Sequence, residues 1–192
     1  LPMAGTPYAP VNSGGVDGYI ARFSPSSAAL TGATYLGTAA FDQSYFVQLD
    51  LLDNVYVVGQ SAGNFPVVGS VYNNPSATQF IQKYDAGLSF LQWSTRIGGT
   101  GSENVAPSAF LVSNCGQIYF SGWGGSTNFV SGGVTSSSTF GLPVTTDAYQ
   151  PGTDGSDFYL MVLQPDAAGL DYATFFGGSS AEHVDGGTSR FD

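Results

Sequence analysis

The chain repeats one long stretch of sequence three times, and this repetition constrains the fold more than any single residue does. The first copy begins at Asp17, the second at Thr78 and the third at Asp157, and each continues to an acid that follows a glycine turn. A second signature, a proline followed six residues later by a tyrosine, precedes each copy. Internal repeats of this length indicate one supersecondary unit that is copied and stacked, each copy burying its apolar face against the next.

The repeats divide residues 1–192, a single repeat domain, into three consecutive units. Unit one covers approximately residues 1–64, unit two residues 65–141 and unit three residues 142–192. Unit two carries an insertion, residues 124–141, and unit three stops before its expected last strand. We therefore expect a segment of a longer repeat protein, in which further blades of the same parent protein or neighbouring subunits complete the array.

Within each unit the apolar residues form short runs rich in Tyr, Phe, Val, Ile and Thr, and turn-forming residues bound each run. This pattern is typical of strands joined by tight turns. Four strands per unit is the count of a β-propeller blade, so the sequence predicts an all-β fold of about three four-stranded antiparallel blades, arranged as a partial or open propeller. The expected strands are residues 19–23, 30–36, 45–50 and 55–58 in unit one, and 80–84, 90–97, 108–112 and 118–121 in unit two.

A glycine and an acid recur together after the second strand of each unit. The glycines supply backbone angles or close approaches that a Cβ atom would forbid. The acids are interpreted as acceptors of hydrogen bonds from backbone amides in the turn, which would hold one blade against its neighbour, and a metal or ligand role is the alternative. These repeat positions are Gly37, Gly98 and Gly177 for the glycine, and Asp42, Glu103 and Glu182 for the acid.

Charge is scarce in this chain and has one sign. Only 9% of the residues are charged and 14 acids face four bases, whereas about 25% of residues are charged in average proteins. So few cations cannot build a basic surface that follows phosphates, which excludes nucleic acid as a partner. No apolar run is long enough to span a membrane. The weakly charged, Ser-rich and Thr-rich composition is typical of an exported protein, and the lone Cys115 has no partner for an internal disulfide.

The sequence contains no catalytic constellation. Residues 59–63 match the G-x-S-x-G pattern of a hydrolase nucleophile around Ser61, but the helix that must follow is absent. The one histidine, His183, lies in another unit. We therefore predict that the protein is not an enzyme, and its single histidine and single cysteine exclude a transition-metal site built from such ligands.

Calcium is the one cofactor that the sequence leaves open. Asp154 and Asp157 place hard oxygen ligands close together in one turn, and a net charge of −10 favours a divalent cation. Their spacing matches no known calcium loop. Turn capping by the same two side chains is the alternative interpretation.

Recognition of a ligand is expected at the inserted loop of unit two. Long loops on a rigid scaffold commonly carry binding residues. Trp123 borders this loop and offers a ring on which a sugar could stack. The candidate ligand-binding residues are Trp123, Ser126, Thr127 and Asn128.

Several phrases of the sequence resemble a known repeat. They are Leu-Pro-Val with a following tyrosine in residues 142–149, Asp-Phe-Tyr-Leu in 157–160, Phe-Phe-Gly-Gly in 175–178 and Asn-Val-Tyr-Val-Val-Gly in 54–59. These phrases resemble the SBBP repeat, the seven-bladed β-propeller repeat of long secreted and cell-surface proteins of bacteria, and the resemblance covers essentially the whole chain. It implies an extracellular location and export like that of type IX secretion cargo in gliding bacteria. The family has no shared catalytic residues.

The leading functional hypothesis is a non-enzymatic extracellular β-propeller module that acts as a scaffold or in adhesion and binds a glycan or a protein through its loops. One alternative is a glycan-active enzyme on a propeller, with Asp147 and Asp154 as its paired acids. Such a pair must lie about 5 to 9.5 Å apart. A second alternative is an architectural subunit of a surface filament or sheath, whose blades contact neighbouring subunits.

Overall fold

The structure, a computed structural model, describes residues 1–99, 105–125 and 137–182. Across these residues the fold is all-β, with one short 3-10 helix, η1 (Pro165–Ala167). Most strands match the sequence-based expectation to within a few residues. The strands are β1 (Gly18–Phe23), β2 (Leu30–Leu36), β3 (Asp42–Leu49), β4 (Val55–Ser61), β5 (Gln79–Tyr84), β6 (Leu91–Ile97), β7 (Ala106–Val112), β8 (Ile118–Trp123), β9 (Phe158–Leu163) and β10 (Leu170–Phe176).

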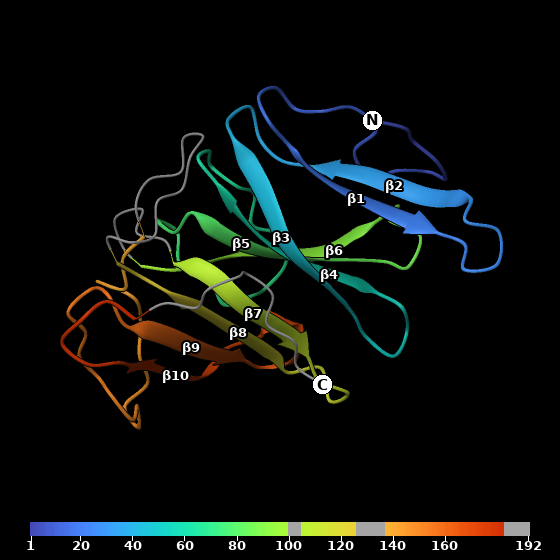
Figure 1. Ribbon diagram of the computed structural model, residues 1–192. Helices are drawn as coiled ribbons and strands as arrows, with labels where there is room; N and C mark the ends of the chain where they lie inside the picture. The colour runs from blue at the N-terminus through green and yellow to red at the C-terminus, as the bar shows by residue number, and fades with distance from the viewer. Residues whose placement is uncertain (100–104, 126–136, 183–192) are drawn as a thin grey trace.

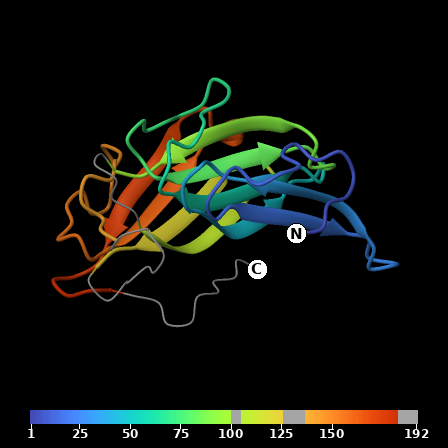
Figure 2. The ribbon, with the colours of Figure 1, turned by 90° about the horizontal axis from the view of Figure 1, so that it is seen from above.

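The strands form three antiparallel sheets that lie one after another (Figure 1). The first sheet contains β1 and β2, the middle sheet β3 to β6, and the third sheet β7 to β10. Seen from above in Figure 2, the blue strands of the first sheet and the orange to red strands of the third sheet lie on opposite sides of the middle sheet. The prediction of an all-β fold with blade-like four-stranded antiparallel sheets is confirmed.

The sheets are out of phase with the sequence units. The middle sheet joins β3 and β4 of unit one to β5 and β6 of unit two, and the third sheet joins units two and three in the same way. The expectation that residues 1–64, 65–141 and 142–192 each form one blade is therefore wrong. The chain leaves the first sheet for the middle sheet inside unit one, through the short link at residues 37–41. β4 then pairs with β5 across residues 62–78, which span the boundary between units one and two.

The two four-stranded sheets have the same register. In the middle sheet Val55 lies opposite Tyr84, and in the third sheet the equivalent residues, Ile118 and Leu163, lie opposite each other. The fold therefore repeats the pairing of the strands as well as their order, and positions in the two sheets can be compared one to one.

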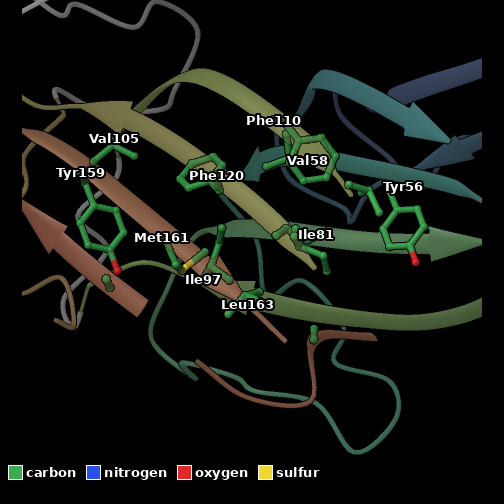
Figure 3. Close-up of a cluster of buried hydrophobic side chains, with 14 of the residues drawn as sticks. Tyr56, Val58, Ile81, Ile97, Val105, Phe110, Phe120, Tyr159, Met161 and Leu163 are labelled. Atoms are coloured by element: carbon green, nitrogen blue, oxygen red, sulfur yellow. The ribbon is translucent and has the colours of Figure 1, made fainter. Parts of the chain in front are cut away.

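The larger core lies between the middle and third sheets (Figure 3). The middle sheet contributes Tyr56, Val58 and Ile81, and the third sheet faces them with side chains that include Phe120 and Met161. All residues of β4 and β5 are buried, as expected for central strands covered on both faces. Burial of this apolar area is the main source of stability in such a stack.

A smaller core lies between the first and middle sheets. Leu36 of β2 and Ile20 of β1 pack there against the opposite face of β4 and β5. The rings of Phe65 and Phe80 stack with centroids 3.7 Å apart. The middle sheet is thus covered by the third sheet on one face and by the two-stranded first sheet on the other.

One ion pair connects the middle sheet to helix η1. Lys83 Nζ donates to Asp166 Oδ1 at 2.7 Å and lies 5.0 Å from the centre of the Tyr56 ring. Burial alone would lower the pKa of Lys83, but hydrogen bonds to Asp166 and Tyr56 raise the pKa above its ordinary value. The hydrogen bond from Lys83 in turn holds the pKa of Asp166 below its usual range.

Candidate functional site

The first candidate site lies where the chain crosses from the first sheet to the middle sheet. At this crossover the amide of Thr38 donates to Asp42 Oδ2 at 2.6 Å, and the amide of Asp42 donates to the carbonyl of Val16 at 2.6 Å. Asp17, the residue just before β1, lies against the same turn. A Cβ atom on Gly37 would lie 2.7 Å from Asp17 Oδ1 and 3.0 Å from Asp42 Oδ2. Glycine is therefore required here because two carboxylates occupy the space that a side chain would take.

The same arrangement recurs where the chain leaves the third sheet. The amide of Gly178 donates to Glu182 Oε1 at 2.9 Å, and the amide of Glu182 donates to the carbonyl of Ser156 at 3.2 Å. A Cβ atom on Gly177 would lie 2.6 Å from Glu182 Oε2 and even closer to Asp157 Oδ1. Asp17 with Asp42, and Asp157 with Glu182, are called the two carboxylate pairs below.

Both carboxylate pairs contain buried oxygen atoms without hydrogen-bond partners among the described residues. These atoms are Asp17 Oδ1, Asp42 Oδ1, Asp157 Oδ1 and Glu182 Oε2. Asp42 is 1% exposed and Asp157 is fully buried. In the described part of the chain the salt bridges all involve Lys83, so no lysine or arginine described here neutralises either pair. Buried charges in proteins are normally paired or bound to a metal.

Unit two differs at this position because Thr78 replaces the first acid. Its second acid, Glu103, lies outside the described residues. Two amides meet here instead, since Gln60 Nε2 and Gln79 Nε2 both donate to the carbonyl of Val105, at 2.8 and 2.7 Å. Gly98 adopts a φ of 133°, a conformation that favours glycine. The described part of this crossover is therefore neutral.

The expected pairing of Asp154 with Asp157 is not the one that the structure forms. Asp154 Oδ1 accepts the amide hydrogen of Ser156 at 2.9 Å, and its own amide donates to Asp157 Oδ2 at 3.3 Å, so Asp154 caps a turn. The carboxylate that meets Asp157 is Glu182, which lies far away in sequence and returns at the crossover. The described residues contain no group of three or more His, Cys, Asp or Glu side chains placed to hold a metal ion.

Sequence reasoning missed that Asp17 is the partner of Asp42. A signal existed, because Asp17 and Asp157 occupy the same repeat position and each lies one sheet crossover away from an acid. Pairing them required knowledge that the chain, after leaving β2 or β10, returns to the residue just before β1 or β9.

Trp123 is the last residue of β8 and is half-buried, with Phe158 as its pairing partner on β9. The other ligand-binding candidates, Ser126, Thr127 and Asn128, lie outside the described residues. The structure therefore places Trp123 at the start of the insertion, and its role in binding stays a prediction.

The described ends of the inserted loop are held in place. The amide of Gly125 donates to the carbonyl of Ser137 at 3.1 Å, and the amide of Thr139 donates to the carbonyl of Gly155 at 3.1 Å. Ser137 and Thr139 are buried. Of the insertion at residues 124–141, both described ends are thus part of the packed structure rather than free loop.

The residues considered for catalysis do not form a site in the described structure. Ser61 is buried and accepts the amide hydrogen of Gly63 at 3.0 Å, and His183 lies outside the described residues. Asp147 and Asp154 are exposed, and neither of them lines the groove beside β1 that is described below.

A groove of about 700 Å³ runs along the free edge of β1. Ile20 and Phe23 of β1 form one side, and Val47 and Leu49 of β3 form the other. In the described structure β1 pairs with β2 alone, whereas the equivalent strands β5 and β9 also pair with β4 and β8. The groove therefore lies where a complete four-stranded sheet would have its first two strands.

Apolar side chains that are buried inside the stack are exposed at its two ends. Val47 and Phe110 occupy the same place in the middle and third sheets, yet Val47 is 54% exposed and Phe110 is 3% exposed. At the other end Leu160 is 41% exposed, whereas the equivalent Ile81 is fully buried. The difference arises because Phe110 and Ile81 are covered by a neighbouring four-stranded sheet.

Comparison with known protein families and with characterised proteins finds no match to this chain. The described residues include no helix with the length and apolar character that a membrane span requires.

Proposed function

We propose that the protein is a non-enzymatic β-propeller scaffold or adhesion module, built from SBBP-type repeats, of a large secreted or cell-surface bacterial protein. The observation that carries this proposal is the exposure of apolar repeat positions, such as Val47 and Leu160, at both ends of the stack. The equivalent side chains inside the stack are buried by a neighbouring sheet, so the exposed surfaces at the two ends are suited to pack against further sheets. Export of the kind used by type IX cargo in gliding bacteria, and an extracellular location, are part of this proposal because they follow from the resemblance and the low charge.

The groove beside β1 takes a two-stranded hairpin from another repeat unit outside these 192 residues. The template is the β3–β4 hairpin, which covers the third sheet with Tyr56 and Val58. An equivalent hairpin would pair its second strand with β1 and cover Val47 and Leu49 with the same side chains. Addition of a strand to an open sheet edge is a common mode of protein recognition, in which backbone hydrogen bonds give affinity and side chains give specificity.

A synthetic peptide with the sequence of residues 42–61 tests this assignment. We expect the peptide to bind the isotopically labelled chain and to shift the backbone amide signals of β1 in an NMR titration. A matched peptide with Tyr56→Asp and Val58→Asp should leave these signals unchanged, and Val47→Asp in the chain should abolish binding of the natural peptide. Failure of the natural peptide to bind at millimolar concentration would refute the assignment.

Recognition of a glycan or protein at the cell surface is proposed for the loop that follows Trp123. The prediction is that removal of residues 126–136 together with Trp123→Ala abolishes binding to glycan arrays or to the host cell surface. The described ends of the loop, including Thr139, are kept because they are packed. A chain that binds equally well without the loop would place recognition elsewhere.

An architectural role is the second candidate, because the two exposed ends of the stack would also allow copies to associate end to end. Sedimentation velocity separates the two functions. A monomer at tens of micromolar favours the repeat module, whereas growth into extended species with concentration favours a filament or sheath.

A further inference from the structure

The two carboxylate pairs have the features of cation sites, and this inference does not depend on the proposed function. Each pair brings two acids together at a sheet crossover, and in each pair one acid is almost completely buried. The two pairs are related by the repeat, down to the backbone hydrogen bonds from Asp42 to Val16 and from Glu182 to Ser156. Because the acids and these backbone hydrogen bonds recur together in two repeats, the carboxylate pair is a regular element of the fold.

The unpartnered oxygen atoms point to a missing positive charge. Asp157 Oδ1 and Glu182 Oε2 both lie against the position that a Cβ atom on Gly177 would take, so the two atoms without partners face each other. Two facing carboxylates repel each other unless a cation or a shared proton lies between them. The described bases do not supply the charge, because Lys83 pairs with Asp50 and Asp166, and Arg22 and Arg96 bond to other groups.

We propose that each carboxylate pair binds one calcium ion. The ligands are oxygen atoms alone, which is the donor set that hard divalent cations select. Calcium accepts irregular geometry, so two carboxylates, nearby carbonyl oxygens and water can complete its shell, whereas magnesium demands a regular octahedron. The pair of Asp157 and Glu182 also lies beside the base of the inserted loop, because the amide of Gly124 donates to the carbonyl of Asp157 at 3.2 Å.

Unit two supplies an internal control. Thr78 replaces the acid there, and the amides of Gln60 and Gln79 occupy the described part of the crossover. The inference is therefore two calcium ions for each chain rather than three.

Isothermal titration calorimetry of the whole chain with calcium chloride tests the proposal. We expect two sites for each chain, with dissociation constants in the range of about 10⁻⁴ to 10⁻³ M or tighter that extracellular calcium modules show. Asp42→Asn and Asp157→Asn should each leave one site, and the double variant should leave none. Asp53→Asn, which removes the same charge from an exposed turn, should keep both sites.

Melting temperatures in calcium and in a chelator provide the second readout. Calcium should raise the melting temperature of the natural chain and should leave that of the double variant unchanged. If a shared proton joins each pair instead, the natural chain will show no calcium binding, and the Asn variants will be at least as stable as the natural chain under all conditions. Either of those two results would overturn the proposal, as would equal loss of calcium binding in Asp53→Asn.

Discussion

Equivalent apolar side chains should contribute more to stability inside the stack than at its ends, and two substitutions at equivalent positions measure this difference. Ile81 and Leu160 occupy the same place in β5 and β9, but Ile81 is fully buried between sheets and Leu160 is 41% exposed. Replacement by alanine removes three carbon groups from each side chain. The cost should differ because Ile81→Ala opens a cavity inside a packed core and Leu160→Ala does not.

The magnitudes follow from burial. Three buried carbon groups at about 0.8 kcal/mol each, with an added cavity term, give a loss of about 3 kcal/mol for Ile81→Ala. Leu160→Ala loses only the buried part of its contacts, about 1 kcal/mol. For a chain of this size each kcal/mol lowers the melting temperature by about 2 to 4 °C, so the expected decreases are about 6 to 12 °C and about 2 to 4 °C.

Urea unfolding followed by far-ultraviolet circular dichroism gives both free energies of unfolding. The slope of the free energy against urea should stay the same in the two variants, so that the change in midpoint reports stability alone. Equal losses for Ile81→Ala and Leu160→Ala would refute the reasoning, because they would show that the outer face of the third sheet is as well covered as the interior.

Two further perturbations test local features. Gly177→Ala should cost about 1 to 3 kcal/mol, because its Cβ would collide with the Asp157 carboxylate, whereas Gly152→Ala, where a Cβ meets nothing within 4 Å, should leave the urea midpoint nearly unchanged. The ion pair of Asp166 with Lys83 contributes stability above the unfolded-state pKa of Asp166, and this contribution is lost as the pH falls through the lowered pKa of the folded state. Because the Asp166 side chain is 63% exposed, the ion pair contributes less than about 1 kcal/mol to the free energy of unfolding. Asp166→Asn should therefore reduce the fall in the urea midpoint that the natural chain shows below pH 5. An unchanged dependence of the midpoint on pH would contradict this assignment.

The strands could be predicted from the sequence because each is a short apolar run between turn residues. The predicted strand at residues 30–36 coincides with β2, and most of the others differ at an end by a few residues. In several cases the difference arises at polar or proline residues, such as Gln79 and Pro107, which pairing with a neighbouring strand brings into the sheet.

The grouping of strands into sheets could not be predicted. A short link such as residues 37–41 normally predicts a hairpin, yet here the glycine turn leads to a different sheet, and the long connection at residues 62–78 joins paired strands. Which strands pair is decided by the cores on the two faces of β4 and β5, and these form only in three dimensions. The sequence repeat shows that the chain contains repeated units, but it does not show at which strand of a unit a sheet begins.

The candidate site was predictable in part for the same reason. The acids Asp42 and Glu182 were visible as repeat positions, but their partners Asp17 and Asp157 lie just before β1 and β9, well before the crossover in sequence. The two acids of each pair come together beside Gly37 or Gly177 only when the chain folds.

Cross-strand contacts between backbone protons, measured by NMR, test the central claim most directly. If sheets form across the unit boundary, nuclear Overhauser effects will connect Val58 to Ile81 and Ser121 to Leu160, and none will connect β2 to β3 as neighbours in one sheet. Effects that join β2 to β3, with none between β4 and β5, would show that each sequence unit folds as its own blade and would contradict the account.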